Sequence, residues 1–468
     1  MRVSRRAGVA IAGLTAAAAA CAAMSTGATA ATWSIPAPAR TSRVSARPGD
    51  TIIHPSRHPY EQPEAPASPA CDAHFCVHWV GRGLDAPPLK DTNGDGVPDY
   101  VERVLAVADH VHHVENEKLG WREPMSDGTR GGGHGKTDIY LTELAGQDVY
   151  GYTATDSDRT PTANGKAWRR SAYLVLDNDY SAFEYPGKPG RDLKVTLAHE
   201  YDHILQNGYD AALVDRDPWC AEATAVWMED QAYNGINDYL RYVHSWVKMW
   251  STPLTQGSIK EYGSAVWNEW LAHHYGRSMI RKVWAGAPST SPTGFAIAAY
   301  ERAIRAAGPS TFGGDFTKFA TAVAEWRTGE GFRESYLYPD MPRQGKLVLG
   351  GATQSRRLRH TTFSLIRVHA PTGGAIEVSL KAPEGVAAGL ALVGRVGSER
   401  HGRTIRDVDY SEAGGELTAT LPDPDRFQRI TAVVVNADTR IRGYDAEDEN
   451  WAYRGGAVPF RVSGRILR

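Results

Sequence analysis

Residues 192–207 read Asp-Leu-Lys-Val-Thr-Leu-Ala-His-Glu-Tyr-Asp-His-Ile-Leu-Gln-Asn, and this stretch decides the fold around it. It opens on an Asp that can cap a helix and contains no Pro or Gly. Asn207 and Gly208 can end a helix. We therefore predict one helix that carries both His199 and His203. Side chains four residues apart on a helix share a face, with Cβ atoms about 5 to 6 Å apart.

Residues 199–203 form the pattern His-Glu-x-x-His, in which two imidazoles can bind one metal ion. Glu200 lies about a third of a turn from His199, so it can reach a water on the open side of the metal. Zn²⁺ at this point would acidify the water and polarise a carbonyl, and Glu200 would accept the proton. The pattern predicts zinc-dependent hydrolysis with Glu200 as general base, and it requires a third protein ligand.

The third ligand is not the histidine of a metzincin, because Gln206 and Tyr209 stand where that motif has Gly and His. Glu222 follows nineteen positions after His203, and Asp217-Pro218 just before it is a favourable helix start. A second helix would thus bring Glu222 across the first, and we prefer Glu222 as the third zinc ligand.

Other ligands compete with Glu222. Glu229 and Asp230 are rivals, because Glu229 follows Glu222 by seven residues and shares its helical face. Cys220 is a weaker candidate, since it is two positions from Glu222 and points elsewhere on the helix.

The spacing of this motif resembles that of the gluzincins, whose pattern is HExxH, eighteen residues, and then Glu in a helix of small and aromatic residues. The match runs from His199 to Trp227. The resemblance implies a zincin-like metallopeptidase domain. It also implies that Glu229 orients a ligand histidine.

Glu261-Tyr262-Gly263 resembles the Tyr-containing helix start of the aminopeptidase branch of the gluzincins, which makes Tyr262 the candidate to assist the oxyanion. The expected helix from Tyr262 to Tyr275 also has an ordinary buried pattern. His273 and His274 compete with Tyr262 for the same role.

Residues 91–102, Asp-Thr-Asn-Gly-Asp-Gly-Val-Pro-Asp-Tyr-Val-Glu, concentrate oxygen ligands and resemble the calcium loops of secreted bacterial modules. The candidate Ca²⁺ ligands are Asp91, Asn93, Asp95, Val97 through its carbonyl, Asp99 and Glu102. The alternative is an acidic turn that caps a helix running to about Leu119. In that helix we expect His110, His112, His113 and residues 115–117 to form a solvated face.

Residues 1–30 resemble a signal peptide, with arginines, an Ala-rich apolar stretch and Ala28-Thr29-Ala30 as a cleavage site. The export route stays open between the general and twin-arginine pathways. Residues 31–70 are rich in Pro, Ala, Ser and Arg and predict a disordered linker or a propeptide. We expect a secreted, extracellular chain in which Cys71 and Cys76 can pair and Cys220 stays a buried thiol.

The remaining chain predicts an α+β fold with two domains. Residues 71–343 combine helical patterns with short apolar strands such as 138–144 and 172–176, as expected of the zincin-like domain. Residues 344–468 alternate like a β-sandwich, with strands expected at 362–368, 375–380, 390–393 and 430–435. The second domain would either stabilise the first or attach it to a substrate or surface.

The order of these features, from about residue 74 to 465, resembles a group of secreted bacterial metallopeptidases with a gluzincin core. We expect a monomer that acts on protein or peptide substrates and has no transmembrane segment. The net charge of −2 argues against nucleic-acid binding. Two alternatives stay open: a zinc amidase acting on cell-wall peptides, and a non-catalytic binding protein with a structural metal.

Overall fold

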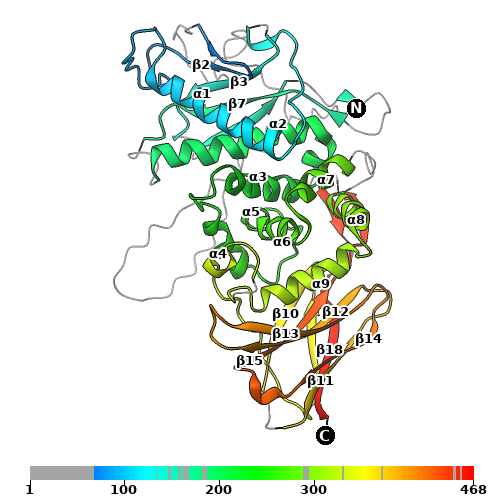
Figure 1. The fold of residues 1–468 in the computed structure, drawn as a ribbon. Coiled ribbons are helices and arrows are strands. Elements are labelled where there is room, and N and C mark those ends of the chain that lie inside the picture. Colours follow the sequence, from blue (N-terminus) through cyan, green and yellow to red (C-terminus); the bar gives the residue numbers. More distant parts are fainter. Residues whose placement is uncertain are drawn as a thin grey trace, which may run out of the picture. The chain divides into compact units, whose positions relative to one another are not determined.

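The computed structural model describes residues 68–467, except for residues 133, 146–148, 157–159, 162–167, 182–186, 288–294, 329–330, 370–372, 446–449 and 454–455. The predicted signal peptide at 1–30 and residues 31–67 of the predicted linker lie outside this part. The chain is mixed α/β and β-rich toward its C-terminus, as predicted (Figure 1). No helix among the described residues is long and apolar enough to cross a membrane.

A five-stranded sheet lies in the first part of the chain, with the strand order β1-β2-β3-β7-β4. Its strands are β1 (Ala70–Cys71), β2 (Phe75–His78), β3 (Thr137–Thr142), β4 (Gly151–Thr155) and β7 (Ala172–Asp177). β2, β3 and β7 are parallel, whereas β4 runs antiparallel to β7 at one edge. β3 and β7 are buried along their whole length, as expected for parallel strands covered on both faces.

Two long helices follow the sheet. α2 (Pro189–Arg216) packs against β4 and β7, and α3 (Pro218–Ala232) packs against α2. Asp217 and Pro218 occupy the N-cap and first position of α3, as predicted. However, the Asp217 carboxylate accepts a hydrogen bond from the N–H of Ala296, at 2.6 Å, and so caps a different helix.

The other helices of the described chain are α1 (Asp99–His112), α4 (Leu240–Lys248), α5 (Ile259–Gly263), α6 (Ala265–Tyr275), α7 (Ser278–Gly286), α8 (Ala296–Ala307) and α9 (Phe312–Val323). Short 3-10 turns lie at Arg130–Gly132, Ser335–Leu337 and Pro424–Arg426, and the pairs β5 (Thr160–Pro161) with β6 (Trp168–Arg169) and β16 (Ile441–Asp445) with β17 (Asn450–Tyr453) are two-stranded.

The structure corrects two predicted helix boundaries. α2 does not end at Asn207-Gly208 but continues to Arg216, with one non-helical residue at Asp210. Asn207 and Gly208 are buried, and packing outweighs their weak helix propensity. The predicted helix from Tyr262 to Tyr275 is divided at Ser264, where α5 ends and α6 begins. The Ser264 hydroxyl lies 3.0 Å from the carbonyl of Lys260 and 3.1 Å from that of Leu254.

The predicted solvated face at the end of α1 is confirmed for His110, His113 and Glu117, which are exposed, but is wrong for His112, Glu115 and Asn116. Residues His113–Lys118 form a π-helix, and its wider turn brings Glu115 and Asn116 inward together with Val114. His112 is buried as well. Asn116 is satisfied there, because its side-chain oxygen accepts from the Tyr201 hydroxyl at 2.9 Å and its nitrogen donates to the carbonyl of Arg122 at 2.9 Å.

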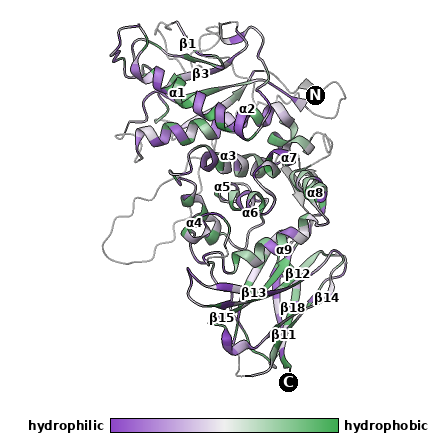
Figure 2. Cartoon of the chain, in the orientation of Figure 1, coloured by the Kyte–Doolittle hydropathy of each residue, from purple (hydrophilic) through white to green (hydrophobic). Residues whose placement is uncertain are grey.

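The C-terminal part contains two sheets, with the orders β13-β12-β15-β10-β8 and β14-β11-β18-β9. Their strands are β8 (Lys346–Leu347), β9 (Gln354–Leu358), β10 (Thr362–Val368), β11 (Ala375–Ala382), β12 (Ala388–Val396), β13 (Arg403–Ser411), β14 (Gly415–Pro422), β15 (Arg429–Asn436) and β18 (Val458–Leu467). Both sheets supply buried side chains to one core, for example Leu392 from the first and Val378 from the second. Figure 2 shows the apolar run of β12.

Helix α9 packs on β12 and β13. Just beyond α9, the buried carboxylate of Glu325 accepts two hydrogen bonds from the guanidinium of Arg429 on β15, both at 2.6 Å. Arg343 donates to the same carboxylate at 3.2 Å. This ion pair therefore joins the helical part of the chain to the β-rich part.

Candidate metal centre

Helices α2 and α3 bring three predicted ligands together. The Nε2 atom of His199 lies 3.1 Å from Oε2 of Glu222, and the Nε2 atom of His203 lies 3.6 Å from the same oxygen. One ligand atom from each of the three residues lies within 4.8 Å of the other two. The spacing of four on one helix and the crossing of the second helix thus produce a compact group of two imidazoles and one carboxylate.

The other nitrogen of each imidazole is held by a partner. Nδ1 of His199 lies 2.8 Å from Oε1 of Glu229, the residue predicted to orient a ligand histidine. Nδ1 of His203 lies 3.0 Å from Oε1 of Gln206. Since a carboxylate and an amide oxygen only accept, both Nδ1 atoms carry a hydrogen, and Nε2 is the atom of each imidazole that would bind a metal ion.

Gln206 is a residue that the sequence reasoning considered only as a departure from another motif. Its amide nitrogen donates to Oδ2 of Asp202 at 2.5 Å and to the carbonyl of Ala221 at 3.0 Å. These two bonds fix the amide so that its oxygen faces His203. The signal was its position three residues after His203, on a neighbouring stretch of the same helical face.

The electrostatics of the group call for a positive charge at its centre. Burial alone would lower the pKa of His199, but the carboxylates of Glu222 and Glu229 outweigh it and raise the pKa well above its usual value. Burial alone would raise the pKa of Glu222, but His203 and His199 outweigh it and lower the pKa. A buried carboxylate that faces two imidazole nitrogens is stable only with protons or a cation between them, so the donor set fits a metal ion.

Glu200 is buried beside the same group and is held by Thr153 of β4. The Thr153 hydroxyl lies 2.9 Å from Oε2 of Glu200 and 2.7 Å from its main-chain oxygen. Sequence reasoning missed Thr153, because it lies on a strand 47 positions away in the chain. The edge strand of the sheet therefore fixes the direction of the predicted base.

Tyr262 lies close to this group, as predicted. Its ring is stacked on that of His199, with centroids 6.0 Å apart, and on that of Tyr242, with centroids 4.9 Å apart. Burial, reinforced by the charge of Glu222, raises the pKa of Tyr262 well above its usual value. The phenol thus stays protonated and can act as a hydrogen-bond donor.

The rival residues lie elsewhere. His273 and His274 are exposed at the end of α6. The Cys220 thiol is buried 3.9 Å from the hydroxyl of Tyr300. Asp230 faces Arg333 at 3.3 Å, and burial raises its pKa to about 7.

Residues 92–96 of the predicted calcium loop are exposed, and several of its side chains form hydrogen bonds within the loop. Asp91 accepts from the N–H groups of Gly94 and Gly96, and Asn93 donates to Asp95 and Glu102, both at 3.1 Å. Asp99 accepts from Thr92. The groups of described residues whose ligand atoms converge do not include this loop. Calcium binding here stays a prediction.

Part of the chain matches a protein family whose function is unknown. Residues 176–336, which include His199, Glu200, His203 and Glu222, match a family of unknown function, DUF6055. No curated protein matches the chain. A solved structure that matches is described as "CorA is a surface-associated copper-binding protein important in Methylomicrobium album BG8 copper acquisition". It is 11% identical, the match covers 26% of this chain and 97% of that chain, and the TM-score is 0.19. The chain is thus similar over its central third to a family of unknown function.

Proposed function

We propose that this protein is a zinc-dependent peptidase of the zincin-like class. The observation that carries the proposal is the convergence of His199, His203 and Glu222, with Glu200 beside them and Glu229 behind His199. His199, His203 and Glu222 would hold the metal. When bound, Zn²⁺ supplies a Lewis acid that polarises a carbonyl and acidifies a water.

The protein's own residues would do the rest of the chemistry. Glu200 accepts the proton of the attacking water and passes it to the leaving amine, while Thr153 keeps its carboxylate in place. Tyr262 donates a hydrogen bond to the developing oxyanion. Glu229 and Gln206 hold both imidazoles in the tautomer that leaves Nε2 free.

The fold supports the same proposal. A zincin-like core needs a helix with both histidines packed on a sheet and a second helix with the acidic ligand, and α2, α3 and the five-stranded sheet supply these parts. We also propose that the chain is exported, because Cys71 and Cys76 form a disulfide, and disulfides form and persist mainly in oxidising compartments outside the cytosol.

The test combines metal analysis with hydrolysis of a mixed peptide library. We expect wild-type protein to cleave peptides and Glu200→Gln to lose about 10²- to 10⁴-fold in rate with its zinc retained, as for loss of a general base. His203→Ala should lose the zinc of this centre.

Glu416→Gln is the matched control, because Glu416 is an exposed residue of β14. It should leave the rate unchanged. Cleavage that is equally fast in Glu200→Gln, or zinc content that is the same in His203→Ala, would contradict the proposal.

A further inference from the structure

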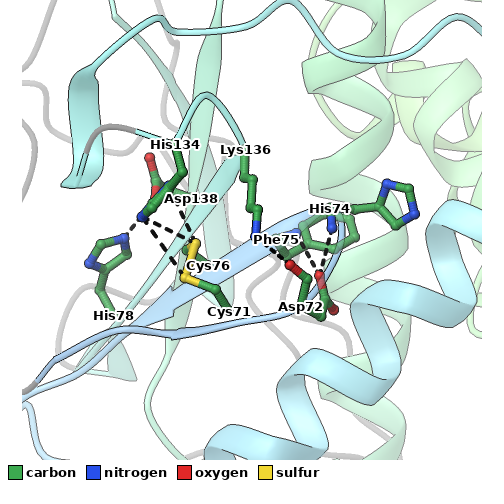
Figure 3. The surroundings of a disulfide bond; sticks show 9 residues. All are labelled: Cys71, Asp72, His74, Phe75, Cys76, His78, His134, Lys136 and Asp138. Atoms are coloured by element: carbon green, nitrogen blue, oxygen red, sulfur yellow. Dashed lines mark hydrogen bonds and ion pairs between the residues drawn. A yellow bond between two sulfur atoms is a disulfide. The ribbon is translucent and has the colours of Figure 1, made fainter.

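A second group of potential ligands lies near the first sheet. The strands β1 and β2 form a hairpin in which Cys71 and Cys76 pair across the strands and are joined by a disulfide. The turn between them is fixed by Asp72, whose carboxylate accepts from the N–H groups of His74 and Phe75 at 2.8 and 2.7 Å. Lys136 donates to the carbonyl of Asp72 at 2.5 Å. Figure 3 shows His74 on this turn, pointing away from the disulfide.

His112, the last residue of α1, lies against His74. The two imidazoles are stacked, with centroids 3.7 Å apart and an angle of 21° between the rings. His112 is only 2% exposed and is flanked by the rings of Phe75 and Tyr201, with centroids 6.2 and 6.5 Å away. One histidine of the pair is therefore fixed by packing, whereas His74 is partly exposed at a turn.

Glu123 completes the group. Its Oε2 lies 3.0 Å from Nε2 of His112, and its side chain is largely exposed. The backbone before it is anchored, because Asn116 donates to the carbonyl of Arg122 and the N–H of Arg122 donates to the hydroxyl of Tyr209 at 3.1 Å. One ligand atom each of His74, His112 and Glu123 lies within 4.8 Å of the other two.

We propose that His74, His112 and Glu123 form a second metal site, for a divalent ion that favours imidazole, such as Zn²⁺. Two imidazoles and a carboxylate suit that class of ion, and the exposed side of Glu123 leaves room for water as a further ligand. In a tetrahedral site with bonds of about 2.0 to 2.2 Å the donor atoms lie roughly 3.4 Å apart. His112 Nε2 and Glu123 Oε2, 3.0 Å apart, are already near that separation, and the ligand atom of His74 lies no more than 4.8 Å from either.

The required movement falls on His74. A metal ion lies in the plane of each imidazole that binds it, so two stacked rings cannot share an ion until one of them turns. His112 is held by Phe75 and Tyr201, whereas the partly exposed His74 can rotate. Binding therefore unstacks the two rings and leaves His112 and the hairpin in place.

This site is distinct from the candidate metal centre. Tyr201, which flanks His112, is two residues from both His199 and His203 and so points about 200° away from them around α2. The proposal does not depend on peptidase activity. It also does not use the group of Cys71, Cys76 and His134, since both sulfur atoms are engaged in the disulfide.

The test is calorimetric titration of the metal-free, oxidised chain with Zn²⁺, without reductant. Reduction would release two thiols beside His134 and add an unrelated set of ligands. We expect two equivalents in the wild type. His74→Gln and Glu123→Gln, both at exposed or partly exposed positions, should weaken one of them by about tenfold or more.

Two further variants assign the equivalents. His203→Ala should lose the other equivalent and keep the one that needs His74. His113→Ala is the matched control, since His113 is an exposed histidine next to His112 that pairs with Glu117 at 2.6 Å. It should keep both equivalents, and the melting temperature of each variant reports whether it folds.

The outcomes separate this site from the proposed active centre. A single equivalent that His203→Ala removes would overturn the second site and leave the peptidase proposal standing. If only one equivalent binds, and His74→Gln removes it but His203→Ala does not, the second site stands and the proposed zinc site of the peptidase is overturned. A second equivalent that persists in His74→Gln, His112→Asn and Glu123→Gln would also overturn the site proposed here.

Discussion

The Thr153 hydroxyl contacts both the carboxylate and the main-chain carbonyl of Glu200, at 2.9 and 2.7 Å. A hydroxyl has one hydrogen, so it donates to one of these oxygens at a time. Both contacts come from the edge strand β4 and meet the same residue of α2. The position of the proposed base is thus set by the packing of a strand on a helix and does not depend on the metal.

Thr153→Val should reduce kcat by roughly 10- to 100-fold, because a hydrogen bond to a charged group contributes about 1.5 to 3 kcal/mol. Valine has nearly the shape of threonine, so zinc content should not change. Thr153→Ser keeps the hydroxyl and should restore most of the rate. If the serine variant is as slow as the valine variant, packing and not the hydrogen bond is responsible. Steady-state kinetics on a cleaved peptide measure this.

Gln206→Leu should weaken zinc binding at the candidate metal centre by about 10- to 100-fold, as for the loss of a residue that orients a metal ligand. His203 would lose its acceptor at Nδ1. Glu229→Gln keeps an acceptor oxygen for His199 and should have a smaller effect. Competition with a chelator of known affinity measures both. Equal affinity in Gln206→Leu and the wild type would contradict the role of this amide.

His360 should make the fold sensitive to acid. Burial lowers its pKa from 6.5 to about 4, and its Nε2 lies 2.9 Å from the hydroxyl of Thr255. Because the folded pKa is below the unfolded one, the stabilisation is complete above pH 6.5 and is lost as the pH falls toward 4. The free energy of unfolding should fall by up to about 3 kcal/mol over this range.

His360→Gln is the comparison for that measurement. Glutamine does not titrate, so the difference in unfolding free energy between pH 7.5 and pH 4.5 should be smaller in the variant. Urea unfolding at the two pH values gives the difference. A variant with the same pH dependence as the wild type would rule out His360 as a source.

Glu325→Ala should destabilise the protein by about 3 kcal/mol, because it removes the buried carboxylate and leaves the largely buried guanidinium groups of Arg429 and Arg343 with only the partly exposed Asp340 as anionic partner. Glu377→Ala is the control, since its partner Arg465 is 68% exposed and such pairs contribute at most about 1 kcal/mol. Thermal unfolding of both variants gives the comparison. Similar effects would mean that the buried ion pair contributes no more than the exposed one.

Local sequence patterns were sufficient for the centre of the molecule. The spacing of His199, His203 and Glu222 placed them on two helices that meet. The seven-residue step from Glu222 made Glu229 a rival ligand, and only the resemblance to the gluzincins implied its place behind His199. These relations depend on the period of one helix and on a short connection. The alternation after residue 344 predicted the β-rich part for the same reason.

Sequence reasoning failed where a contact depends on tertiary pairing. Thr153 reaches Glu200 only because β4 pairs with β7 and packs on α2, which no local pattern records. Glu115 and Asn116 were expected in solvent because a regular helix was assumed. The π-helix changed the period, and Tyr201 then provided the buried partner for Asn116.

The disulfide between Cys71 and Cys76 has a practical consequence for anyone who produces this protein. Expression in a reducing cytosol would yield two free thiols near His134, and purification on immobilised nickel or in zinc-containing buffer could then load that trio. The metal content of such a preparation would include ions bound by the reduced cysteines, which the oxidised protein does not bind. Protein that has been exported into an oxidising compartment should therefore be used to measure the number of metal ions bound per chain.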